Sequence, residues 1–145
     1  MLPDVNVLVS ASRADHPHFA AAERWLRDAR EDPQVALVIL PVVAAGFLRV
    51  VRLTQMFAVP TPHAEALRFL RALLATPGAT MPLHGAEWAP FEELYERRAP
   101  EPRGVTDVWI AAAVLHLGEH LVTLGRGFRR LLPDAQLTVL DPAAP

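Results

Sequence analysis

Two residue types are missing from this 145-residue chain, cysteine and lysine. Without cysteine there can be no disulfide, no thiolate nucleophile and no cysteine-bound zinc or iron centre, and a reducing compartment, the cytoplasm, is the expected location. Without lysine, all 14 basic residues are arginine. This excludes a P-loop lysine, a Schiff base and a lysine general base, so hydrolysis of nucleoside triphosphates is not expected.

Long apolar runs and a strong net charge are also absent. No apolar stretch approaches the roughly 20 residues that span a bilayer, and the first residues lack a basic leader, so we expect neither a membrane segment nor export. The net charge of −2 offers no overall attraction to phosphate backbones, so nucleic-acid binding would depend on a local basic cluster. With 52% hydrophobic residues, the chain can bury the core of one domain. We expect that domain over residues 1–140, followed by an Ala/Pro-rich tail over 141–145.

The apolar pattern divides the chain into alternating strands and helices. Expected strands cover residues 2–9, 35–39, 79–81, 121–124 and 137–140, and expected helices cover residues 17–29, 41–51, 61–76, 87–98 and 106–117. Gly118 is the expected stop of the last helix. Short strands that alternate with helices predict an α/β fold, a three-layer α/β/α sandwich around a mostly parallel sheet of about four to five strands.

Two acidic residues, Asp4 and Asp107, stand out at positions where such a fold places its sites. Asp4 lies in the first apolar run and Asp107 in the first turn of the expected last helix. Sites in an open parallel sheet form outside the carboxyl ends of the strands, and Mg²⁺ or Mn²⁺ takes oxygen ligands while keeping several waters. Each acid alone also has a structural explanation. Asp4 would form a turn hydrogen bond with Asn6, and Asp107 would be stabilised by the helix dipole.

Four stretches change this balance because they occur together and in order. They are Pro-Asp-Val-Asn-Val-Leu-Val, Gly-Phe-Leu-Arg-Val, Val-Thr-Asp-Val-Trp-Ile-Ala-Ala-Ala and Leu-Val-Thr-Leu-Gly-Arg-Gly-Phe. The chain resembles, over nearly its whole length, the PIN-domain ribonuclease toxins of the VapC type. That resemblance implies that Asp4 is the first metal-binding acid, Asn6 its supporting polar neighbour, Asp107 the acid on the later helix and Thr123 a hydroxyl at a strand end.

The resemblance also implies an activity and partners. A protein of this type would be a Mg²⁺- or Mn²⁺-dependent endoribonuclease, in which a metal-bound water attacks the RNA phosphodiester and Asp4 and Asp107 hold the ion. It would be the toxin of a toxin-antitoxin pair, with a cognate antitoxin that covers the site, and it would form a homodimer. Exposed apolar residues around Phe57 would suit a partner helix, or would belong to the core of the monomer.

The chain also departs from the family pattern. Such toxins usually carry a glutamate within or just before the Gly-Phe-Leu-Arg stretch, where this chain has Ala44 or Gly46. They usually carry an aspartate two residues after the strand-end threonine, here Gly125, and often another at the position of Gly127. Two acids in place of four predict weaker metal binding and slower hydrolysis.

Two readings therefore stay open. The chain is either an endoribonuclease that works with a reduced acid cluster, or a PIN-like protein that binds RNA or an antitoxin without cutting. A nearby acid, Glu119 or Asp134, could replace a missing one in the first case.

Arginines near the expected site have two explanations as well. Arg126, Arg129 and Arg130 follow Gly125 and would contact RNA phosphates at the rim of the site, or form a solvated helix end. Arg49 matches a frequent arginine of the family, and a buried structural ion pair is the alternative.

Two histidine patterns resemble metal sites. The stretch from His116 to His120 has the letters H-x-x-E-H of a zinc peptidase helix, but the expected helix stop at Gly118 interrupts it. Residues 15–18, Asp-His-Pro-His, could bind a metal, although polar residues before a helix are more often a solvated cap.

Overall fold

The computed structural model of the chain describes residues 1–82, 85–98 and 104–141. The regular elements in chain order are β1 (Leu2–Pro3), α1 (Val5–Ala11), α2 (Phe19–Glu31), α3 (Pro41–Val50), α4 (His63–Leu74), α5 (Trp88–Arg98), α6 (Val105–Leu117), β2 (Leu121–Thr123) and β3 (Leu137–Val139). Two 3₁₀ helices, Gly127–Arg130 and Asp134–Gln136, lie between β2 and β3.

The strands form a parallel sheet in the order β1-β2-β3. Leu2 pairs with Leu121, and Leu121 pairs in turn with Leu137. On the other side of β1, the backbone N–H of Val38 donates to the Met1 carbonyl over 2.9 Å, and Val38 forms a parallel bridge with Thr80. The predicted α/β class with a parallel sheet is confirmed. The described residues form three regular strands, and the expected strands at 35–39 and 79–81 are reduced to this bridge.

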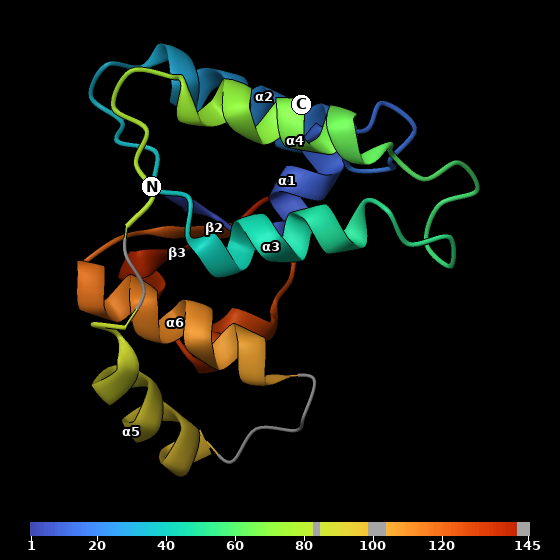
Figure 1. The fold of residues 1–145 in the computed structure, drawn as a ribbon. Helices are drawn as coiled ribbons and strands as arrows, with labels where there is room; N and C mark the ends of the chain where they lie inside the picture. Colours follow the sequence, from blue (N-terminus) through green and yellow to red (C-terminus); the bar gives the residue numbers. More distant parts are fainter. Residues whose placement is uncertain (83–84, 99–103, 142–145) are drawn as a thin grey trace.

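Helices pack on both sides of the sheet. Figure 1 shows α2 and α4 on one side of the molecule and α5 and α6 on the other, with the strands, α1 and α3 between them. Helix α6 has buried apolar residues on most of its sides, from Val108 to Val114, because it lies between the sheet and α5. Helix α1 packs against both α2 and α3.

The prediction of a first strand over residues 2–9 is wrong for most of these residues. Only Leu2 and Pro3 are strand, and the helix α1 begins at Val5. Asp4 starts this helix, because its side chain accepts a hydrogen bond from the backbone N–H of Val5. Five consecutive residues from Val7 to Ala11 are buried, so the helix shows no polar face that would reveal its period.

Most other expected elements are confirmed within a few residues. Helix α3 begins at Pro41, and α6 ends at Gly118, whose φ of 65° is the left-handed conformation that glycine adopts without strain. The division at residue 140 stays a prediction, because residues 142–145 lie outside the described part. None of the described helices is long and apolar enough to cross a membrane.

Candidate metal centre

The Asp4 carboxylate lies where β1 ends and α1 begins, and only 6% of the residue is exposed. One carboxylate oxygen, Oδ1, accepts a hydrogen bond from the backbone N–H of Val5 over 2.6 Å. The other, Oδ2, accepts from the Thr123 hydroxyl over 2.9 Å. Both donors are neutral, and no arginine side chain in the described part of the chain forms an ion pair with Asp4. The carboxylate is thus held in place without being neutralised.

Asn6 and Thr123 connect the first turn of α1 to the end of β2. The Thr123 hydroxyl oxygen accepts hydrogen bonds from the Asn6 side-chain amide over 3.0 Å and from the backbone N–H of Gly125 over 3.1 Å. The Asn6 side-chain carbonyl accepts from the backbone N–H of Leu124 over 3.1 Å. Thr123 is fully buried, so its hydroxyl is committed to this network. Through these hydrogen bonds, Asn6 and Thr123 fix the orientation of the Asp4 carboxylate.

The acidic groups of the site have raised pKa values. Burial raises the pKa of Asp4 to about 6, against the lowering effect of the hydrogen bonds from Thr123 and Val5, and the nearby charge of Asp107 raises it further. Burial also raises the pKa of Asp107, which is half-buried in the first turn of α6. The structure thus brings together the two predicted metal-binding acids. A divalent cation between them would favour both charged forms.

The described residues contain no group of three or more acidic or histidine side chains that could hold a metal ion. Asp4 and Asp107 are therefore the carboxylate donors that the described residues offer here. Mg²⁺ and Mn²⁺ take oxygen ligands and commonly bind through one or two carboxylates together with waters and a substrate phosphate. The donor set fits such an ion, with water and phosphate oxygens completing the coordination.

The positions of the missing acids differ in their surroundings. A Cβ atom at Gly125 would lie 3.6 Å from Asn6 Nδ2 and 3.7 Å from Thr123 Oγ1, which are ordinary contact distances. A Cβ at Gly46 would lie 2.8 Å from Cγ2 of Val5, the residue after Asp4. Ala44 instead packs in the hydrophobic core. A side chain at Gly46 would clash with Val5, so these contacts do not favour Gly46 over Ala44 as the place of the missing glutamate, and they show that α3 approaches α1 closely there.

Neither proposed replacement acid lies at the site. The Glu119 carboxylate forms an ion pair of 3.0 Å with the N-terminal amino group of Met1. Asp134 starts the 3₁₀ helix before β3. Both residues precede strands, whereas Asp4 and Thr123 lie at strand ends, on the opposite edge of the parallel sheet. The idea that Glu119 or Asp134 supplies a missing ligand is therefore wrong.

Four arginines project into solvent near these elements. Arg126, Arg129 and Arg130 are exposed in or next to the 3₁₀ helix that follows Gly125. Arg49, in the last turn of α3, is also exposed, so the alternative of a buried ion pair is wrong for it. Within the described residues, none of these four side chains forms an ion pair or a hydrogen bond.

The histidine patterns form no metal site in the structure. His116 lies in the last turn of α6, whereas His120 lies beyond Gly118 and bonds to the Ala135 carbonyl and the Thr138 hydroxyl. In the Asp-His-Pro-His stretch, the Asp15 carboxylate pairs with Arg13 at 2.7 Å.

Phe57 packs against the core of the monomer and is partly buried. The Arg13 guanidinium carbon lies 4.1 Å from the centre of its ring.

One buried carboxylate has no counterpart in the sequence analysis. Glu87 is 4% exposed, and its oxygens accept hydrogen bonds from the Trp109 indole N–H and the Gly85 backbone N–H, each over 2.9 Å. Trp109 and Asp107 are two residues apart on α6 and so point to opposite sides of the helix. Glu87 therefore connects the start of α5 to α6 and does not belong to the candidate metal centre. Nothing in the local sequence marks it as buried.

Comparisons with known proteins agree with this arrangement. The family model of the PIN domain matches residues 1–131. The chain belongs to the PIN-domain family, and it is of the VapC type. It is 35% identical over 129 residues to a VapC ribonuclease of Mycobacterium bovis and, equally, to Ribonuclease VapC43 of Mycobacterium tuberculosis, covering 88% of this chain and 86% of each relative. Ribonuclease VapC39 of M. tuberculosis is 29% identical over 128 residues, covering 84% of this chain and 86% of the relative.

A solved structure supports the fold independently. The crystal structure of VapBC2 from Rickettsia felis, bound to a DNA fragment from its promoter, contains a chain similar to this one with a TM-score of 0.70. The match covers 97% of this chain and 98% of the other at 19% sequence identity. At 19% identity, this similarity shows that the two chains share a fold.

Proposed function

We propose that this VapC-type protein is the toxin of a toxin-antitoxin pair and hydrolyses RNA phosphodiester bonds as a divalent-metal-dependent endoribonuclease. The observation that carries the proposal is the Asp4 carboxylate, which is buried beside Asp107, is held by Thr123 and pairs with no arginine among the described residues. The relatives named as VapC ribonucleases, at 35% identity, supply the substrate class and the reaction.

Each residue of the centre has a role in this proposal. Asp4 and Asp107 hold Mg²⁺ or Mn²⁺, while Asn6 and Thr123 keep the Asp4 carboxylate oriented through their hydrogen bonds. Such an ion would supply a water of lowered pKa and positive charge that offsets the charge developing on the phosphate. Arg126, Arg129 and Arg130 contribute contacts to the RNA backbone, which position the strand without reading its sequence.

We further propose a cognate antitoxin as the protein partner, a homodimer as the assembly and the cytoplasm as the location. The similar Rickettsia chain was crystallised as part of VapBC2, and this favours an antitoxin partner here. A second function, RNA or antitoxin binding without cleavage, is favoured by Ala44 or Gly46, and by Gly125, in the places of the usual acids.

The experiment that separates the two functions is cleavage of a mixed RNA pool by purified protein with Mn²⁺, with Mg²⁺ or with EDTA. Asp4→Asn removes the buried charge, and Asp28→Asn is the matched control, since Asp28 is exposed on α2. We expect metal-dependent cleavage by the wild type and by Asp28→Asn, and none by Asp4→Asn. Well-folded wild-type protein that cuts nothing with either ion would favour the binding function.

A further inference from the structure

We propose that Arg49 binds a phosphate of the RNA strand at the Asp4–Asp107 centre, as a positively charged counterpart supplied by α3. The inference rests on the proposed function, because it assigns Arg49 to the same site. It names a residue on a different element from the arginines that follow β2.

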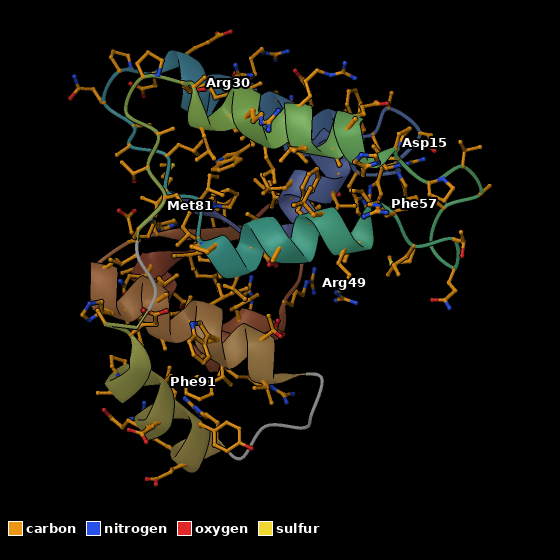
Figure 2. The ribbon with its side chains drawn as sticks, viewed as in Figure 1. Asp15, Arg30, Arg49, Phe57, Met81 and Phe91 are labelled. Atoms are coloured by element: carbon orange, nitrogen blue, oxygen red, sulfur yellow. The ribbon has the colours of Figure 1, made fainter. Side chains whose placement is uncertain are left out.

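The position of α3 brings Arg49 close to the site. A Cβ at Gly46 would touch Val5, so α3 passes against the first turn of α1, directly beside Asp4. Arg49 follows Gly46 by three residues, which places it on the same side of the helix and roughly 4.5 Å further along the axis. Figure 2 shows Arg49 on the side of α3 that faces α6, the helix that carries Asp107. A long arginine side chain can reach a phosphate bound between these elements.

The surroundings of Arg49 leave its guanidinium available. Helix α3 contains no acidic residue, and the Arg49 side chain forms no ion pair or hydrogen bond with any described residue. The guanidinium therefore keeps its planar set of N–H donors for a phosphate, which it can bind with two parallel hydrogen bonds.

The reduced acid count strengthens this argument. With two carboxylates near the ion in place of four, the centre repels an RNA phosphate less. An arginine beside it adds attraction for the phosphate and for the charge that develops on it during hydrolysis.

The test compares Arg49→Ala and Arg49→Lys with the matched control Arg71→Ala, since Arg71 is an exposed arginine in the last turn of α4. Binding of a fluorescent single-stranded RNA oligonucleotide is measured by anisotropy in EDTA over a series of salt concentrations, so that no cleavage occurs. Loss of one phosphate contact lowers the slope of log K against log salt by about 0.7 for a single strand. We expect this for Arg49→Ala, and wild-type slopes for Arg71→Ala and Arg49→Lys.

Cleavage with Mn²⁺ then places the contact at the reacting phosphate. We expect the cleavage rate of Arg49→Ala at saturating RNA to fall by at least about tenfold, with a smaller loss for Arg49→Lys, because a lysine keeps the charge but not the paired donors. Thermal unfolding shows whether each variant is folded, and an exposed side chain should leave it unchanged.

Equal salt slopes, or equal cleavage rates, for Arg49→Ala and Arg71→Ala would overturn the assignment while leaving the proposed function in place. A wild-type protein that binds RNA but cuts none would contradict the nuclease function, and the salt slope alone would then decide the role of Arg49. A wild-type protein that does not bind RNA would contradict both.

Discussion

The two ends of helix α1 each hold a charged side chain that is almost removed from solvent. Asp4 lies at the start of the helix and is 6% exposed. Arg13 follows its last turn, and the Arg13 side chain is 9% exposed. The two ends thus pose the same energetic problem, a charge taken out of water, with opposite signs.

At the Arg13 end, residues of the protein itself compensate the buried charge. The guanidinium donates to both carboxylate oxygens of Asp15 over 2.7 and 3.0 Å, to the Thr61 hydroxyl over 2.8 Å and to the Val59 carbonyl over 3.0 Å. It also covers the ring of Phe57. The loops before α2 and before α4 are connected in this way. A buried charge with a complete set of opposite partners is explained by structure alone.

At the Asp4 end, no described residue of opposite charge compensates the buried carboxylate. Its carboxylate receives two neutral hydrogen bonds, and the Asp107 charge that acts on it has the same sign. This arrangement disfavours the charged form and would be relieved by a cation. Among the described residues, Asp4 therefore has no partner of opposite charge, and a divalent cation would supply one.

The largest expected effect is a pH dependence of stability that belongs to Asp4. The folded protein keeps the Asp4 proton up to a pKa of about 6, whereas the unfolded chain loses it near the ordinary value of 3.8. Between these values the folded state binds the additional proton, so the free energy of unfolding falls as the pH rises. A difference of two pKa units corresponds to about 3 kcal/mol. Asp4→Asn should lose this part of the dependence.

The measurement is urea unfolding without metal between pH 4 and pH 7, for the wild type and Asp4→Asn. Groups common to both proteins cancel in the difference, including Asp107, whose raised pKa acts in the same direction. Curves that stay parallel over this range would mean that the Asp4 charge is compensated within the protein.

A smaller effect is expected from Arg13→Ala. The variant leaves the Val59 carbonyl without its donor and uncovers Phe57, which should lower the free energy of unfolding by about 2 kcal/mol. Arg27→Ala is the matched control, because Arg27 is half exposed and pairs with Glu23 on the surface of α2. Its loss should stay within about 0.5 kcal/mol. RNA cleavage by folded Arg13→Ala should match the wild type, and a selective loss of cleavage would show that this end also serves function.

The smallest expected effect restores one missing acid. Gly125→Asp places a carboxylate next to Asn6 and Thr123, where the added side chain fits at ordinary contact distances. Mn²⁺ should bind about tenfold more tightly, since the added carboxylate makes the site more negative. Ala72→Asp is the control, because it adds the same charge at an exposed position on α4. Calorimetric titration should show the gain for the first variant only, and equal affinities would place Gly125 outside the coordination sphere.

The sequence predicted the parallel α/β fold, most helices and the pair Asp4–Asp107, because proline and glycine signals mark helix ends and the motifs keep their order. It misplaced α1, whose buried apolar residues carry no period. It did not reveal Arg13 or Glu87, because their burial depends on segments far away in the chain, such as Val59 and Trp109. Contacts between such distant segments form only through tertiary packing.

The central claim is that the acidic end of α1 is completed by a divalent cation and the Arg13 end is not. Titration of Mn²⁺ into metal-free protein, with the wild type, Asp4→Asn, Asp107→Asn and Asp15→Asn, tests it directly. We predict that the wild type and Asp15→Asn bind the ion with the same affinity, and that Asp4→Asn and Asp107→Asn lose this binding. Wild-type affinity in Asp4→Asn and Asp107→Asn would contradict the account.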